Sequence, residues 1–152
     1  MSISNDNEFK KIFFRLEQDE DGYPSSTVEG LWAKATDDSY IIDNTPFYIY
    51  DIAPGDTVSA LSIGDELWFE SVKKSAGSSV FRAIVTNRDT IGELRSALMT
   101  LGCPSEANQV IGIIAIEIPQ ATQIGPVLDY LMEQQAQGNL DFEEGVLRHA
   151  LP

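Results

Sequence analysis

The first half of the chain alternates apolar and polar residues in the way that β-strands do. In residues 9–16, Ile12, Phe14 and Leu16 fall on one face of an extended segment, and charged or aromatic residues fall on the other. Segments rich in Asp, Gly and Pro separate this run from the next ones, as turns do. Further strands are therefore predicted over residues 27–35, 40–43, 47–50, 57–63 and 66–73.

The last two of these strands flank the dipeptide Gly64-Asp65. A two-residue loop with Gly first is the sequence that a type II′ hairpin prefers, because its first position requires a positive φ. The sequence therefore predicts an antiparallel hairpin over residues 57–73.

The second half mixes strands with segments of helical period. Residues 80–86 and 110–118 are almost continuously apolar and predict buried strands. Two helices are predicted, over residues 90–101 and from Ile124 to about Gly138, the first with Thr90 and Glu93 as a capping box. Residues 140–147 predict a last strand or a short helix, and the pattern leaves both open.

Together these elements predict an α+β fold. An N-terminal antiparallel β lobe, barrel-like or a meander, spans residues 9–76 after a flexible segment at 1–8. Residues 77–152 form a β-α-β-α unit that resembles a split ferredoxin-like sheet. The length suits one compact body made of these two lobes.

The amino-acid composition argues against several classes of protein. The net charge of −14 argues against a nucleic-acid or anionic-membrane binder and indicates a cationic partner. The single Cys103 excludes an internal disulfide, and the N-terminus shows no export signal, so the cytoplasm is the expected location. No apolar run is long enough to cross a bilayer.

Candidate catalytic groups are few. His149 is the one histidine and lies close to the C-terminus, where chains are usually mobile, and Cys103 has few cations in the sequence to activate it. Residues 77–79 match neither Gly-rich phosphate loop. We therefore expect a protein that is not an enzyme and that holds no cofactor and no metal.

Acidic residues cluster at predicted strand ends of the first lobe. Turns favour Asp, so each cluster has a plain structural explanation, but together they would attract a basic protein. The candidate partner-binding residues are Asp19, Glu20, Asp21, Asp37, Asp38, Asp65 and Glu66. The aromatic residues of this lobe lack neighbouring bases in the sequence, and we expect more of them in the core than at an interface; they are Tyr23, Trp32, Tyr40, Phe47, Tyr48, Tyr50 and Trp68.

Several sequence blocks resemble a bacterial family of small proteins classed as a domain of unknown function. The more specific blocks are E-x-L-W, at residues 29–32, and I-D-N-x-P-F, at residues 42–47. Weaker ones are Gly55-Asp56, Ser75-Ala-Gly77 with Arg82, and Leu101-Gly-Cys103, and the chain has Val80 where the family pattern has Thr. The resemblance implies a shared fold over about residues 9–147 and no particular activity.

In size, acidity and lack of a catalytic signature the chain is also similar to immunity proteins of contact-dependent inhibition systems. Our leading hypothesis is an immunity protein that neutralises a cationic toxin domain, with a nuclease as the favoured target. An alternative is a small enzyme or ligand-binding protein that uses a cleft between the lobes near Asp43, Asn44, Asp56 and Arg82. A third hypothesis is a nucleic-acid mimic that occupies a DNA-binding protein.

Overall fold

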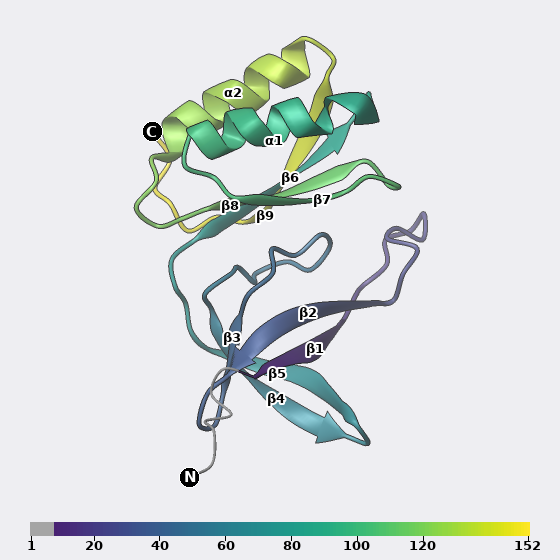
Figure 1. The fold of residues 1–152 in the computed structure, drawn as a ribbon. Coiled ribbons are helices and arrows are strands. Elements are labelled where there is room, and N and C mark those ends of the chain that lie inside the picture. The colour runs from purple at the N-terminus through teal and green to yellow at the C-terminus, as the bar shows by residue number, and fades with distance from the viewer. Residues whose placement is uncertain (1–7) are drawn as a thin grey trace. The chain divides into compact units, whose positions relative to one another are not determined.

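The computed structural model describes residues 8–152, and the predicted flexible segment 1–8 lies outside the described residues except for Glu8. The chain divides after Ala76 into two compact units, called unit 1 and unit 2 below. Unit 1 is all β and unit 2 combines a sheet with two helices, so the chain has a mixed α+β fold (Figure 1).

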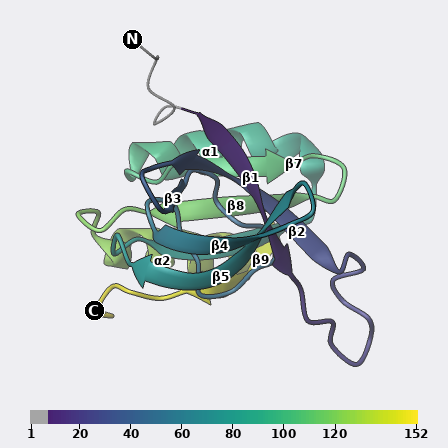
Figure 2. The same cartoon turned by 90° about the horizontal axis from the view of Figure 1, so that it is seen from below.

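Unit 1 is a closed barrel of five strands in the order β1-β2-β3-β4-β5. Successive strands pair antiparallel, and a short parallel pairing of β1 with β5, Ile12 opposite Leu67, closes the barrel. Both views show the 16–27 loop between β1 and β2 extending away from these strands (Figure 1, Figure 2). The strands are β1 Phe9–Arg15, β2 Val28–Ala35, β3 Tyr40–Ile42, β4 Thr57–Ile63 and β5 Glu66–Lys74.

The alternating pattern correctly identifies the core of this barrel. Ile12 and Phe14 of β1 are almost fully buried, and the charged or aromatic residues between them point outward. The predicted hairpin is also confirmed, since Ile63 pairs with Glu66 and Gly64 has a φ of +63°. The buried core residues are Ile12, Phe14, Leu31, Ala33, Ile42, Ile52 and Val58.

The strand predicted over residues 47–50 is wrong. This segment has no ladder partner and belongs to a long irregular loop, residues 43–56, between β3 and β4. Its backbone N–H groups are bonded to a glutamate side chain instead of to a neighbouring strand, as described below.

Unit 2 is a four-stranded antiparallel sheet in the order β7-β8-β6-β9, with both helices on one face (Figure 1). Along the chain its elements follow as β-α-β-β-α-β. They are β6 Ser79–Val85, α1 Ile91–Thr100, β7 Ser105–Asn108, β8 Ile113–Ile118, α2 Ile124–Ala136 and β9 Leu140–Val146.

Helical spacing correctly predicts both helices and the residues that they bury. Leu94 and Leu98 of α1, with Val127 and Leu131 of α2, pack against the side chains of the central strands. The segment at 140–146, open between strand and helix, is the strand β9. Neither helix of the described chain is long and apolar enough to cross a membrane.

Two details of unit 2 differ from the prediction. The apolar run 110–118 is a strand only from Ile113, because Val110 and Ile111 form an exposed turn that joins β8 to the unpredicted short strand β7. The capping box of α1 is also absent. The Thr90 side chain makes no cap hydrogen bond, and Asn87 instead accepts the N–H of Asp89 at the start of a single 3-10 turn that leads into the helix.

Candidate functional site

The seven candidate partner-binding acids are all exposed and lie on three loops of unit 1. The 19–21 cluster lies between β1 and β2, 37–38 between β2 and β3, and 65–66 at the β4–β5 turn. Asp38 lies 3.8 Å from Lys73, at the end of the β4–β5 ladder opposite to Asp65. A strand rises about 3.3 Å per residue, so the 37–38 and 65–66 clusters lie on the order of 20 Å apart and do not form one patch.

The side chain of Asp19 also stabilises its own loop through hydrogen bonds. Its Oδ1 atom accepts the backbone N–H groups of Asp21 and Tyr23, both at 2.9 Å. This is the Asx-type bonding that closes a turn. Asp19 therefore shapes the loop on which Glu20 and Asp21 stand exposed.

The side chains of Asp56 and Asn44, two of the four residues proposed for a cleft, make hydrogen bonds within unit 1. Asp56 is fully buried, and its two carboxylate oxygens accept the N–H groups of Ala53 and Ala76. Asn44 accepts the N–H of Trp32 at 2.7 Å. Asp43 is exposed.

Arg82 belongs to unit 2, where it is 1% exposed on strand β6. Its guanidinium lies 3.9 Å from the carboxylate of its cross-strand partner Glu143. It also lies close to Gly145, where an added Cβ would be 3.2 Å from Nη2. Arg82 is thus packed into the sheet of unit 2.

A residue that was not among the predicted site residues holds the irregular loop of unit 1 in place. Glu29, on β2, is 9% exposed. Its Oε2 accepts the N–H of Phe47 at 2.7 Å, and its Oε1 accepts those of Tyr48 and Ile49 at 3.1 and 2.9 Å. One carboxylate thereby satisfies three consecutive backbone donors that would otherwise be left without a ladder.

These bonds explain the two most specific sequence blocks. Glu29 and Trp32 come from the E-x-L-W block, and they bond Phe47 and Asn44 of the I-D-N-x-P-F block. Burial, and then the charge of Glu29, raise the pKa of Tyr48 in the same loop. The paired blocks therefore form a brace that fixes the 43–56 loop to β2, and their spacing in the sequence was the available signal for it.

His149 is bonded through both ring nitrogens. Nε2 lies 2.9 Å from the carbonyl oxygen of Pro119, which can only accept, so Nε2 donates and Nδ1 accepts from the Ser79 hydroxyl at 2.6 Å. Ser79 is fully buried, and its Oγ also accepts the N–H groups of Arg148 and His149. This arrangement anchors the C-terminal segment to the start of β6.

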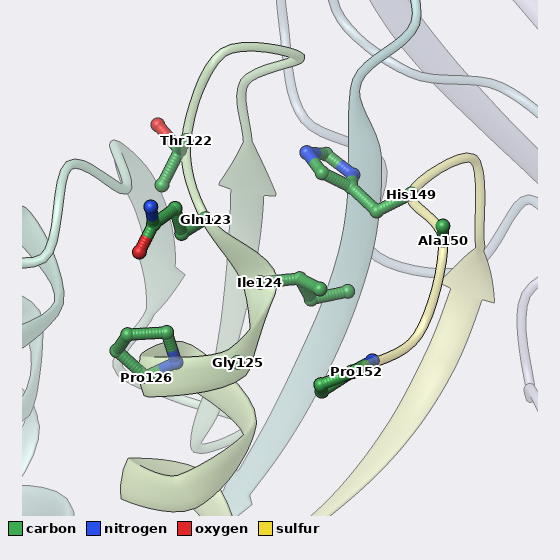
Figure 3. A pocket seen from close by; sticks show the side chains of 8 residues that line it. All are labelled: Thr122, Gln123, Ile124, Gly125, Pro126, His149, Ala150 and Pro152. Atoms are coloured by element: carbon green, nitrogen blue, oxygen red, sulfur yellow. The ribbon is translucent and has the colours of Figure 1, made fainter.

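A pocket of about 350 Å³ adjoins His149 at the start of α2 (Figure 3). Its walls come from residues 122–126 and from His149, Ala150 and Pro152 of the C-terminal segment.

Cys103 is buried, and burial and the charge of Glu117 raise its pKa to about 11. Its thiol is therefore protonated at neutral pH. Within residues 8–152 no three His, Cys, Asp or Glu side chains are arranged to hold a metal ion.

Both tryptophans of unit 1 lie outside the barrel core, in the minority that the sequence analysis left for a surface position. Trp32 is 46% exposed, and Trp68 is half-buried on the outer wall of the barrel. The Lys11 ammonium lies 5.2 Å from the ring centre of Trp32, and the Arg15 guanidinium lies 4.4 Å from that of Trp68. Both bases come from β1, far away in the sequence, so only strand pairing brings them to the indoles.

Comparisons with known proteins identify a family and a solved structure of similar fold. Residues 29–142 match the model of a domain of unknown function, DUF4265. The chain is also similar to the crystal structure of a hypothetical protein from Neisseria gonorrhoeae, with 15% sequence identity, a TM-score of 0.73, and coverage of 93% of this chain and 96% of the other. No curated protein matches the sequence.

Proposed function

We propose that this chain, which belongs to the DUF4265 family, acts by binding a cationic protein rather than by catalysis. More specifically, we propose a cytoplasmic immunity protein that neutralises a bacterial toxin domain of the contact-dependent inhibition type. A nuclease is the favoured target, because an active site that binds a phosphate backbone must itself be cationic.

The observation that supports this proposal is the acidic surface of unit 1. Its seven loop acids are exposed, and the whole chain carries 24 acidic against 10 basic residues. Such a surface attracts a cationic protein and speeds association by about 10- to 1,000-fold at low salt. Exposed ion pairs contribute only about 0–1 kcal/mol each, so the acids would act chiefly on the association rate.

The groups that a small enzyme would use are engaged in structural bonds. Ser79 and His149 bind the C-terminal segment. The carboxylate of Asp56 accepts two backbone N–H groups, and the thiol of Cys103 is buried. These bonds favour the binding hypothesis over the enzyme alternative.

We also infer that unit 2 is the split ferredoxin-like sheet. Its β-α-β-β-α-β order, with β6 and β8 at the centre and β7 and β9 at the edges, supports this assignment. Such a fold hosts many unrelated functions, so the assignment carries no activity of its own.

The test is a growth experiment in bacteria. The open reading frame beside this gene, or its C-terminal domain, is induced with and without co-expression of this chain. We expect killing that this chain alone relieves. Absence of toxicity, or toxicity that co-expression leaves unchanged, would contradict the proposal and favour a search for a small-molecule ligand.

With the purified pair, the association rate should fall steeply between 50 and 500 mM NaCl. Glu20→Lys with Asp21→Lys should slow association about fivefold if the 19–21 loop faces the partner. The matched control is Asp89→Lys with Glu144→Lys, two exposed acids of unit 2 whose replacement changes the net charge by the same amount. Equal rates for the two variants would exclude the 19–21 loop from the interface.

A further inference from the structure

A groove of about 500 Å³ lies between the two helices on the outer side of unit 2. The helices lie side by side on one face of the sheet (Figure 1). The C-terminal half of α1 contributes Ala97, Thr100 and the following Leu101. The volume falls within the range of cavities that receive a ligand or an anchoring side chain.

The α2 side of this α1–α2 groove has the same helical spacing. Pro126, Asp129, Tyr130 and Glu133 lie at positions i, i+3, i+4 and i+7, so they share one helix face. Tyr130 of this face also packs against the core cluster that contains Val127 and Leu131, while Asp129 and Glu133 are exposed. The groove is therefore formed by the two helices and by Leu101, at the start of the turn that follows α1.

The groove combines an apolar floor with an acidic rim on its α2 side. Ala97, Leu101 and Tyr130 are partly buried in it, and Asp129 and Glu133 are exposed on its α2 side. An apolar floor favours an apolar side chain, and carboxylates at the rim favour cations beside it.

Cations of the two helices do not neutralise these carboxylates. Helix α2 contains no Lys or Arg. The one base of α1, Arg95, uses Nε and Nη2 to bond the side-chain and backbone oxygens of Ser105 on β7. The helices therefore present an acidic groove.

Acidic side chains of both helices act on the phenol of Tyr130 in the groove. Burial raises its pKa, and the charges of Glu133 and Glu93 raise it further. Glu93 precedes Ala97 by one helical turn, so acids of both helices act on the same phenol.

Resting on the proposed function, we infer that the α1–α2 groove receives a basic segment of the cationic partner. An apolar side chain of that segment enters between Ala97 and Tyr130, and lysines or arginines beside it meet Glu93, Asp129 and Glu133. The loop acids of unit 1 then act at long range on association, and the groove supplies the close contact. Desolvated apolar anchors in such pockets account for most binding energy at interfaces.

The first test uses a defined probe, a 14-residue amphipathic helical peptide of leucine and lysine, with the whole chain in ¹⁵N-labelled form. We expect amide shifts concentrated at residues 93–101 and 126–133. Shifts confined to the 19–21, 37–38 and 65–66 loops would contradict the inference, and so would the absence of binding. The same peptide with glutamate in place of lysine should produce no shifts.

Two charge variants separate the groove from the overall charge. Asp129→Lys with Glu133→Lys and Asp65→Lys with Glu66→Lys change the net charge by the same amount. We expect the groove pair to weaken peptide binding about tenfold or more and the loop pair to weaken it less than threefold. Equal losses would show that only net charge matters and would overturn the inference.

A second pair tests the apolar floor. Ala97→Arg places a long cation in the groove, and Ala136→Arg makes the same change at the exposed end of α2. We expect the first to abolish peptide binding and the second to leave it within twofold, with helical circular dichroism unchanged in both. Unimpaired binding by Ala97→Arg would contradict the inference.

The growth experiment separates the two proposals. If the unmodified chain relieves toxicity and the Asp129 and Glu133 pair does so equally well, the proposed function stands and the groove is not its site. If the unmodified chain relieves nothing but the peptide shifts map to the groove, the groove binds cationic segments and the immunity proposal fails.

Discussion

Single buried acceptors determine how the irregular part of unit 1 is held. Glu29 accepts three consecutive backbone N–H groups of the 43–56 loop, Asn44 of this loop accepts the N–H of Trp32 on β2, and Asp56 accepts those of Ala53 and Ala76. A loop of this length without regular structure is uncommon in a compact fold and needs such internal bonds. The carboxylate of Glu29 takes the place of a neighbouring strand for residues 47–49.

Glu29→Gln should destabilise the protein by about 2–3 kcal/mol. The substitution removes the charge and turns one acceptor oxygen into an amide donor that faces backbone N–H groups. The midpoint of urea unfolding, followed by tryptophan fluorescence, measures the loss. Glu66→Gln, at an exposed position of the same barrel, should change stability by less than about 0.5 kcal/mol. Equal midpoints for the two variants would refute the bracing role of Glu29.

At the scale of elements, most strand and helix periods are correct, and apart from the strand predicted over residues 47–50 and the unpredicted β7 the errors lie at the ends of elements. Val110 and Ile111 extend the apolar run of β8, but they form the exposed turn to β7. Thr90 and Glu93 have the spacing of a capping box, but the chain enters α1 through a 3-10 turn that Asn87 caps. A pattern of residue types does not show which of two neighbouring side chains, Asn87 or Thr90, makes the cap hydrogen bond.

Asn87→Ala should destabilise the protein by about 1 kcal/mol, the usual loss for a helix cap. Its side chain accepts the N–H of Asp89 at 3.0 Å, and alanine leaves that donor without this partner. Thermal or urea unfolding provides the measurement. Glu93→Gln serves as the comparison and should change stability by less than about 0.5 kcal/mol; a larger effect at Glu93 than at Asn87 would restore the capping-box interpretation.

For the whole molecule, the net charge of −14 is a cost to folding. Like charges repel one another more strongly in the compact state than in the unfolded chain. Salt screens this repulsion, with a Debye length of about 30 Å at 0.01 M and about 10 Å at 0.1 M.

The melting temperature should therefore rise by several degrees, roughly 3–6 °C, between 10 and 300 mM NaCl. Differential scanning calorimetry measures it. The variant with Asp65→Lys and Glu66→Lys has less self-repulsion and should show a smaller rise. A melting temperature that falls with salt would indicate that attractive pairs, rather than repulsion, dominate the surface.

The sequence by itself determined the local structure of most elements. Alternation in residues 9–16, the Gly64-Asp65 hairpin and the helical stripes of α1 and α2 depend on neighbouring residues, and so they could be read directly. Composition likewise determined the net charge. These properties are short-range or additive, and tertiary structure does not change them.

Only the tertiary structure decided which distant groups meet. The bonds from Glu29 to residues 47–49, the bases of β1 beside Trp32 and Trp68, and Ser79 beside His149 join residues up to 70 positions apart. The α1–α2 groove likewise requires two helices that a β-hairpin separates in the chain. Such contacts depend on strand register and helix packing, which a one-dimensional pattern does not encode position by position.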